Sequence, residues 1–200
     1  MGSSRGHSRD DVARAALRIL DEYGLPDLTM RRLAAALDVQ PSALYWHFPN
    51  KQSLLAELSD RIVGRTVPAP APAQSNWTAR VSAEASALRD ALLAYRDGAE
   101  VVASTLALGL DGAGVRDRLS AAVAAGGFDA VTTRRATTTL LHFVLSHVSQ
   151  EQLGMQYDSL GVRAENAEHA TEDAADSPSA EFAFGVELIV GGLRLSRIDA

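Results

Sequence analysis

The sequence has no cysteine, a single lysine and no long apolar run, and these shortages exclude several classes of protein. Without cysteine there can be no disulfide and no thiolate metal site, which fits the reducing cytoplasm. No apolar stretch approaches the roughly 20 residues needed to cross a bilayer, and residues 1–8 lack the apolar core of a signal peptide. We therefore expect a globular, cytoplasmic protein with no membrane-spanning segment.

The negative charge is unevenly distributed along the chain. The whole protein carries a net charge of −6, which on its own argues against a nucleic-acid partner. Residues 1–65 hold nine basic and eight acidic residues (net +1), whereas residues 66–200 hold ten and seventeen (net −7). Because affinity for DNA depends on the cations that face phosphate, the total charge does not exclude DNA binding by the N-terminal third. A net charge of +1 is a weak basic signal, however, and does not by itself predict it.

The N-terminal third begins with a predicted amphipathic helix. Apolar residues recur at helical spacing from Val12 to Tyr23, with Ser8 or Asp10 available as the N-cap. Gly24 is suited to end this helix.

A second and a third helix, separated by a tight turn, follow from residue 29 onward. Thr29 is a good N-cap, and Pro41 fits the first turn of a short third helix because its missing N–H costs nothing there. Pro49 is expected to end the third helix and Asn50 to cap a fourth. This pattern is typical of a helix-turn-helix, in which a short helix enters the major groove of DNA.

The rest of the chain predicts a larger helical region. An extended, proline-alternating spacer is expected at residues 67–73 and loops at residues 111–114 and 126–127. Acidic residues accumulate towards the C-terminus, and residues 160–181 are expected to be mobile because few of them are large and apolar. No strand alternation is found, so we expect an all-α protein. Helical apolar stripes are found at residues 81–102 (with a possible break at Gly98), 140–148 and 182–193.

The last of these stripes contains glycines, which cost stability inside a helix unless a close neighbour requires them. We therefore expect tight packing against another helix at Gly185, Gly191 and Gly192.

Two groups of motifs resemble the tetracycline-repressor (TetR) family of bacterial transcriptional regulators. The first covers Leu44–Leu55, together with the Leu-Thr and Arg-Arg-Leu-Ala sequences of residues 28–34. The second covers Ala91–Ala99, Leu141–Phe143 and Phe184–Ile189, with Gly127-Phe128, and is similar to the family's ligand-binding domain. Nearly the whole chain is included, and the N-terminal motif is the more specific.

The resemblance implies a homodimeric regulator, most often a repressor, with no enzymatic activity. It would bind a palindromic DNA operator through residues 1–65 and leave it when a small molecule enters residues 66–200. The apolar residues Leu88, Val102 and Leu106 favour a hydrophobic effector. The resemblance also implies that helices near residues 132–149 and 181–197 form the dimer as a four-helix bundle.

Residues at the start of the second and third helices are the candidates for DNA contact. Thr29 and Arg31 are expected at phosphates, Thr29 acting first as a cap. The third helix begins with Gln40, Pro41, Ser42 and Ala43, which are expected near base edges, where a glutamine amide can bind adenine. For each of these four, a role as part of a solvated turn remains equally open.

The aromatic residues that follow have separate expected roles. Tyr45 and His47 can donate to phosphates, whereas Trp46 is expected to be partly buried because an indole is costly to expose. His47 lacks neighbours with the spacing of metal ligands. Lys51 lies in the first turn of a helix, where a cation is disfavoured unless a phosphate is bound there. We therefore regard Lys51 as the strongest candidate for a phosphate contact.

The resemblance also indicates where an effector would bind, and the residues present there argue against a metal. The family's tetracycline-binding members use a histidine at the position of Val102, a second histidine at Val67 and an asparagine at Glu84. Valine cannot coordinate Mg²⁺, which requires oxygen ligands and waters. We therefore expect no cofactor and an effector other than magnesium–tetracycline. The candidate effector residues are Glu84, Leu88, Val102, Thr105, Leu106, His142 and His147, although a core or interfacial role is the more frequent one for a histidine.

Two other functional classes compete with this interpretation. An enzyme is disfavoured because the chain has no Gly-x-Ser-x-Gly, no His-Glu-x-x-His and no glycine-rich phosphate loop. Asp97 and Glu100, one helical turn apart, are more typical of a solvated helix face than of a catalytic pair. A helical protein-interaction module that does not bind DNA remains the alternative, because the N-terminal third is nearly neutral.

Overall fold

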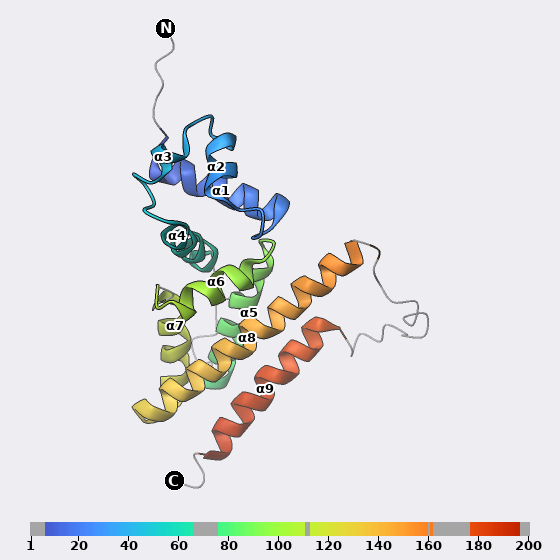
Figure 1. Cartoon of the computed structure of the whole chain (residues 1–200). Helices are drawn as coiled ribbons and strands as arrows, with labels where there is room; N and C mark the ends of the chain where they lie inside the picture. The colour runs from blue at the N-terminus through green and yellow to red at the C-terminus, as the bar shows by residue number, and fades with distance from the viewer. Residues whose placement is uncertain (1–6, 66–75, 111–112, 160, 162–176, 197–200) are drawn as a thin grey trace. The chain divides into compact units, whose positions relative to one another are not determined.

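The computed structural model describes residues 7–65, 76–110, 113–159, 161 and 177–196, and all regular structure within these ranges is helical (Figure 1). The predicted all-α fold class is therefore confirmed. The helices form two compact units: residues 1–65 with 92–112, and residues 66–91 with 113–200. The functional division at residue 65 stays a prediction, since packing places residues 92–112 with the first unit.

None of the helices in the described ranges combines the length and the apolarity needed to cross a membrane.

Helix α1 (Arg9–Tyr23) begins at a capping box. The Ser8 hydroxyl accepts the N–H of Asp11, while the Asp11 carboxylate accepts the N–H of Ser8. Hydrogen bonds from the Ser8 hydroxyl and backbone lower the pKa of Asp11 to about 2. Gly24 ends the helix with φ of 85°, a conformation that glycine adopts readily. Of the two predicted caps, Ser8 is the one used.

Helices α2 (Met30–Ala36) and α3 (Pro41–Leu44) form the predicted helix-turn-helix. The Thr29 hydroxyl caps α2 by accepting the N–H of Arg32, and Pro41 occupies the first helical position of α3. Asp38 in the intervening turn has φ of 52°, a region that aspartate tolerates better than most residues. The predicted starts of both helices are confirmed.

Helix α3 is shorter than predicted, and its early end exposes Trp46. The Leu44 carbonyl accepts the N–H groups of both His47 and Phe48 at 2.9 Å, so the chain turns at residues 45–47 instead of remaining helical up to Pro49. Leu44 and Phe48 are 1% and 0% exposed, whereas Trp46 is 90% exposed. The expectation that Trp46 is partly buried is therefore wrong, because Phe48 fills the core and the turn directs the indole outward.

Helix α4 (Lys51–Gly64) starts as predicted at Asn50, whose side chain accepts the N–H of Ser53. Its buried face packs on α1 and on α6 (Gly98–Ala107). A break at residues 94–97 separates α6 from α5 (Trp77–Leu93). A Cβ atom on Gly98 would lie 2.4 Å from the Leu92 carbonyl oxygen, so this close approach requires glycine. The predicted break near Gly98 is confirmed.

The second unit contains most of α5 together with α7 (Ala113–Ala124), α8 (Ala130–Ser159) and α9 (Pro178–Ser196). The predicted loop at residues 111–114 is wrong for 113 and 114, which are helical, and residues 111–112 lie outside the described residues. The loop predicted at residues 126–127 is confirmed. The predicted spacer and most of the predicted mobile segment also lie outside the described residues, although residues 178–181 of that segment are helical.

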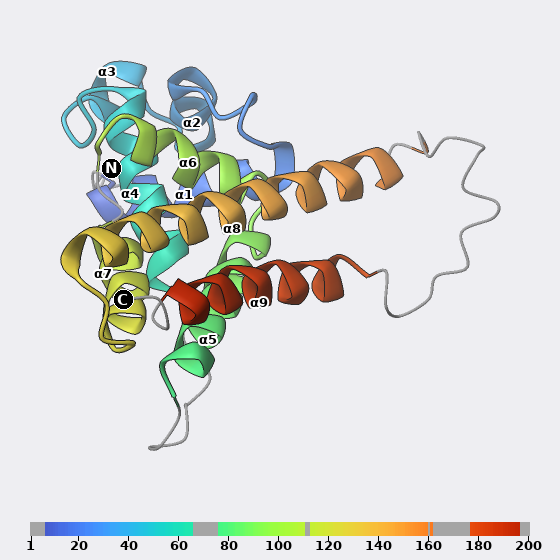
Figure 2. The same cartoon turned by 90° about the horizontal axis from the view of Figure 1, so that it is seen from below.

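Helices α8 and α9 lie side by side in the second unit (Figures 1 and 2). The rings of Phe143 and Phe182 stack with centroids 5.7 Å apart. A Cβ atom on Gly185 would lie 2.2 Å from Phe143 Cζ, so glycine permits this approach. Nothing in the described chain lies within 4 Å of such an atom on Gly191 or Gly192. The predicted close packing is thus found at Gly185 alone.

Replacing Gly185 by alanine is expected to destabilise the protein by about 1–3 kcal/mol, because the added methyl group overlaps the Phe143 ring. Gly154→Ala in α8 is the matched control, since a Cβ atom there meets nothing within 4 Å. It is expected to stabilise the helix by about 0.5–1 kcal/mol. Urea unfolding followed by circular dichroism measures both changes, and equal stabilisation by the two variants would contradict the packing described here.

Candidate functional site

The ten residues predicted to contact DNA lie in the first unit, and each is at least partly exposed. Pro41, His47 and Lys51 are half-buried and the other seven are exposed. Beneath them the fully buried Leu33 and Leu44 anchor α2 and α3. The arrangement that the prediction requires is therefore present, although the contacts themselves stay a prediction. The ten residues are Thr29, Arg31, Gln40, Pro41, Ser42, Ala43, Tyr45, Trp46, His47 and Lys51.

The two adjacent arginines of α2 differ in their surroundings. Arg32 forms an ion pair with Asp27, and its guanidinium lies 3.6 Å from the centroid of the Tyr23 ring. Arg31 is exposed and has no ion-pair partner among the described residues. Arg31 is therefore the cation of this pair that can bind an external phosphate.

Two exposed aromatic residues follow α3. Tyr45 is 48% exposed and Trp46 is 90% exposed, which is unusual for so large an apolar group. Exposed aromatic residues with a polar N–H or O–H are typical of surfaces that bind a partner. Sequence reasoning selected both residues but missed the exposure of Trp46.

Lys51 occupies the first position of α4, where unpaired backbone N–H groups attract an anion. Asn50 takes the N–H of Ser53, and no acceptor among the described residues takes those of Lys51 or Gln52. The ammonium and two N–H groups can therefore bind the same phosphate.

An ion-pair network fastens α4 to α1. Arg9 donates to Glu57 at 2.9 Å, and Arg61 donates to both Glu57 and Asp10. Burial would raise the pKa of Glu57, but hydrogen bonds from Arg61 and Arg9 outweigh burial and lower it. The Arg9 guanidinium also lies 4.6 Å from the Phe48 ring centroid. Sequence reasoning missed this network, although the four-residue spacing of Glu57 and Arg61 was a readable signal.

The segment before α6 contacts two other parts of the first unit. The Asp97 carboxylate accepts the N–H of Leu25, just after α1, at 2.7 Å. Arg65, at the end of α4, donates to the Tyr95 hydroxyl at 2.6 Å. The segment before α6 therefore contacts both the α1–α2 turn, through Asp97, and the end of α4, through Tyr95.

The seven predicted effector residues are divided between the two units. In the first, Val102 and Thr105 are buried and Leu106 is half-buried, with the Thr105 hydroxyl donating to the Val102 carbonyl. In the second, Leu88 is buried, and Glu84 Oε2 lies 3.4 Å from Arg118 Nε. The assignment of an effector to these residues stays a prediction. The remaining two are His142, which is exposed, and His147, which is half-buried.

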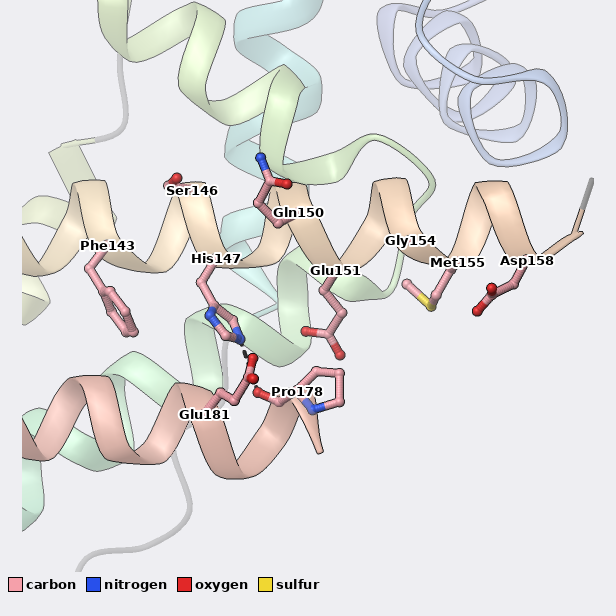
Figure 3. Close-up of a pocket in the computed structure, with 10 residues that line it drawn as sticks. All are labelled: Phe143, Ser146, His147, Gln150, Glu151, Gly154, Met155, Asp158, Pro178 and Glu181. Atoms are coloured by element: carbon pink, nitrogen blue, oxygen red, sulfur yellow. Dashed lines mark hydrogen bonds between the residues drawn. The ribbon is translucent and has the colours of Figure 1, made fainter. Parts of the chain in front are cut away.

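One cavity of about 620 Å³ lies between α8 and α9 in the second unit (Figure 3). His147 is the only predicted effector residue among its lining residues, and its Nε2 lies 2.9 Å from the Pro178 carbonyl oxygen. Among the described residues, no group of three or more His, Asp or Glu side chains is arranged to hold a metal. The cavity is lined by Phe143, Ser146, His147, Gln150, Glu151, Gly154, Met155, Asp158, Pro178 and Glu181.

Comparison with protein families matches nearly the whole chain. Residues 13–58 match the model of bacterial regulatory proteins of the tetR family, and residues 69–196 match that of the tetracycline repressor-like C-terminal domain. The chain is 37% identical to the class A tetracycline repressor protein from transposon 1721 of Escherichia coli. That alignment covers 94% of this chain and 90% of the relative.

Solved structures show the same likeness. Mycobacterium smegmatis BioQ superimposes with a TM-score of 0.81 at 36% identity, covering 94% of this chain and 97% of BioQ. BioQ with its double-stranded DNA operator gives a TM-score of 0.77 at 35% identity, covering 94% and 98%. Streptomyces coelicolor ActR in complex with (S)-DNPA gives 0.77 at 26% identity, covering 96% and 98%.

Replacing Lys51 by alanine is expected to weaken DNA binding and to make it less dependent on salt. Loss of one phosphate contact should reduce the slope of log K against log salt concentration by about 1. Fluorescence anisotropy between about 50 and 200 mM salt gives the slope, because phosphate contacts change affinity strongly over this range. Gln52→Ala, which removes no charge, is the control, and an unchanged slope in the lysine variant would exclude the Lys51–phosphate contact.

Proposed function

The chain belongs to the TetR family of DNA-binding transcriptional regulators, which are not enzymes, and we propose that it is a cytoplasmic repressor released from a palindromic operator by a small hydrophobic effector. The observation that carries this proposal is the exposed face of the helix-turn-helix. Arg31 and Trp46 are exposed there, Lys51 at the start of α4 is half-buried, and Leu33 and Leu44 are fully buried. The likeness to BioQ, whose structure includes its operator, supports this assignment.

We propose a homodimer formed through α8 and α9. Phe184, Leu188 and Leu195 are 60–64% exposed and recur at helical spacing along α9. Gly191 and Gly192 lie between them, with open space where a Cβ atom would be. Exposed apolar stripes of this kind support association with a second helix, and the small residues permit a close approach. A two-fold dimer would present two recognition elements, each consisting of α2 and α3 of one subunit, to a palindrome.

The proposed release mechanism depends on α4. The ion pairs of α4 with α1 should make a displacement of α4 carry the recognition element with it. Asp97 and Tyr95 link the segment before α6 to Leu25 and Arg65 in the same unit. An effector that shifts α6 would therefore change the separation of the two recognition elements from about 34 Å, one turn of DNA. Such coupling is typically worth about 1–3 kcal/mol.

The effector is proposed to be a small, largely apolar molecule, and each of the predicted effector residues remains a candidate contact within its own unit. Relatives bind varied compounds: one solved structure holds an Acinetobacter baumannii TetR variant with minocycline, and ActR is solved with (S)-DNPA. In this chain the buried residues Leu88 and Val102 favour apolar contacts. The side chain of Val102 offers no atom that could coordinate a metal.

We accordingly predict that the protein does not bind tetracycline in a magnesium-dependent manner. Calorimetric titration of the purified protein with tetracycline, with and without Mg²⁺, measures this directly. The expected result is no magnesium-dependent heat at micromolar protein. Tight binding that requires Mg²⁺ would contradict the proposed role of Val102.

The proposed function itself is tested by selecting DNA that binds the protein from a random-sequence pool. A two-fold dimer predicts enrichment of palindromes whose half-site centres are separated by about one helical turn, near 10 base pairs. A variant with both Arg31 and Lys51 replaced by alanine is the control and should enrich no sequence. Failure of the wild-type protein to enrich any sequence would favour a helical protein-interaction module instead.

A further inference from the structure

Arg89 of α5 contacts two other helices of the second unit at once. Its Nη2 and Nε donate to the two carboxylate oxygens of Glu151 on α8 at 2.6 and 3.1 Å. Its guanidinium carbon lies 5.5 Å from the centroid of the Phe182 ring on α9. One side chain therefore links α5, α8 and α9.

The Arg89–Glu151 pair is largely removed from water. The two side chains are 13% and 14% exposed, the lowest values for both partners of any ion pair among the described residues. A two-pronged guanidinium–carboxylate pair has a restricted geometry, because both hydrogen bonds require the groups to be nearly coplanar. A pair with this geometry and this burial restricts the position of α8 relative to α5 more than a single exposed ion pair would.

Phe182 extends this restraint to α9. Its ring stacks on Phe143 and packs 5.4 Å from the His147 ring, while His147 contacts the Pro178 carbonyl oxygen. Figure 3 shows His147 and Glu151 directed from α8 towards the first turn of α9. Arg89 therefore contacts two of the residues at the packed α8–α9 surface, Glu151 and Phe182. It follows Leu88 directly in the sequence.

We propose that Arg89 is a positioning residue for the homodimer. Its contacts with Glu151 and Phe182 fix the relative orientation of α8 and α9, the two helices to which the partner subunit binds. This inference rests on the proposed dimer through α8 and α9. A dimer formed by two helices of each chain requires those helices to be held in one relative orientation before association. The adjacent Leu88, a predicted effector residue, gives effector binding on α5 a route to the same two helices.

Sedimentation velocity across a dilution series tests this proposal on the full-length protein. Arg89→Met leaves Glu151 without its partner and is expected to weaken dimerisation at least tenfold. Arg118→Met is the matched control, because it breaks an ion pair between α7 and α5 in the same unit that does not involve α9. That control is expected to dimerise about as tightly as the wild type, because sites that share no partners act nearly independently.

The double variant Arg89→Met, Glu151→Met separates positioning from stability. It removes both charges, so no unpaired carboxylate remains buried and thermal stability should return towards that of the wild type. Because the rigid two-pronged link is also gone, dimerisation should stay at least tenfold weaker. Recovery of wild-type dimerisation along with stability would overturn the positioning role. A monomeric wild-type protein would instead refute the proposed dimer on which the inference rests.

Discussion

The burial of Leu44 and Phe48 is the constraint on which the functional face depends. Helix α3 spans only Pro41–Leu44, so it cannot hold its own position by hydrogen bonds within the helix. Its position comes from two fully buried side chains, one on each side of the turn at residues 45–47. Because these two point inward, Trp46 between them points out.

Phe48 also links α3 to α1 and α4, the helices whose displacement would move it. Phe48 is covered by the Arg9 guanidinium, which also binds Glu57 on α4. Through Arg61 and Asp10 the network returns to α1, so Phe48, α1 and α4 are linked by one set of contacts. A regulator that works by moving its recognition helices requires such contacts, since a loose α3 would not transmit a shift of α4.

Local signals predicted the starts of helices well. The caps at Ser8, Thr29 and Asn50 and the proline at the first position of α3 depend on neighbouring residues alone, and the structure confirms them. The end of α3 could not be predicted in this way. Pro49 is a strong local stop signal, but the helix ends earlier because Phe48 packs into a core built from distant residues.

Contacts between distant residues were the other part that the sequence did not reveal. Asp97 and Leu25 are 72 residues apart, and Arg89 and Glu151 are 62 apart. No periodicity or spacing rule connects such pairs, because they meet only when separate helices pack. The effector residues could not be predicted from spacing either. The resemblance to a family identified them as candidates, and in the structure they belong to two separately packed units.

The most direct test of the account uses Trp46 as its own reporter. The chain has two tryptophans, so a Trp77→Phe variant leaves Trp46 as the sole source of indole emission. A selected palindromic DNA is expected to change this emission, with saturation at one palindrome per two chains. An unrelated duplex of equal length is expected to leave it unchanged. Emission that stays unchanged while the palindrome is fully bound would contradict the claim that this exposed face meets DNA.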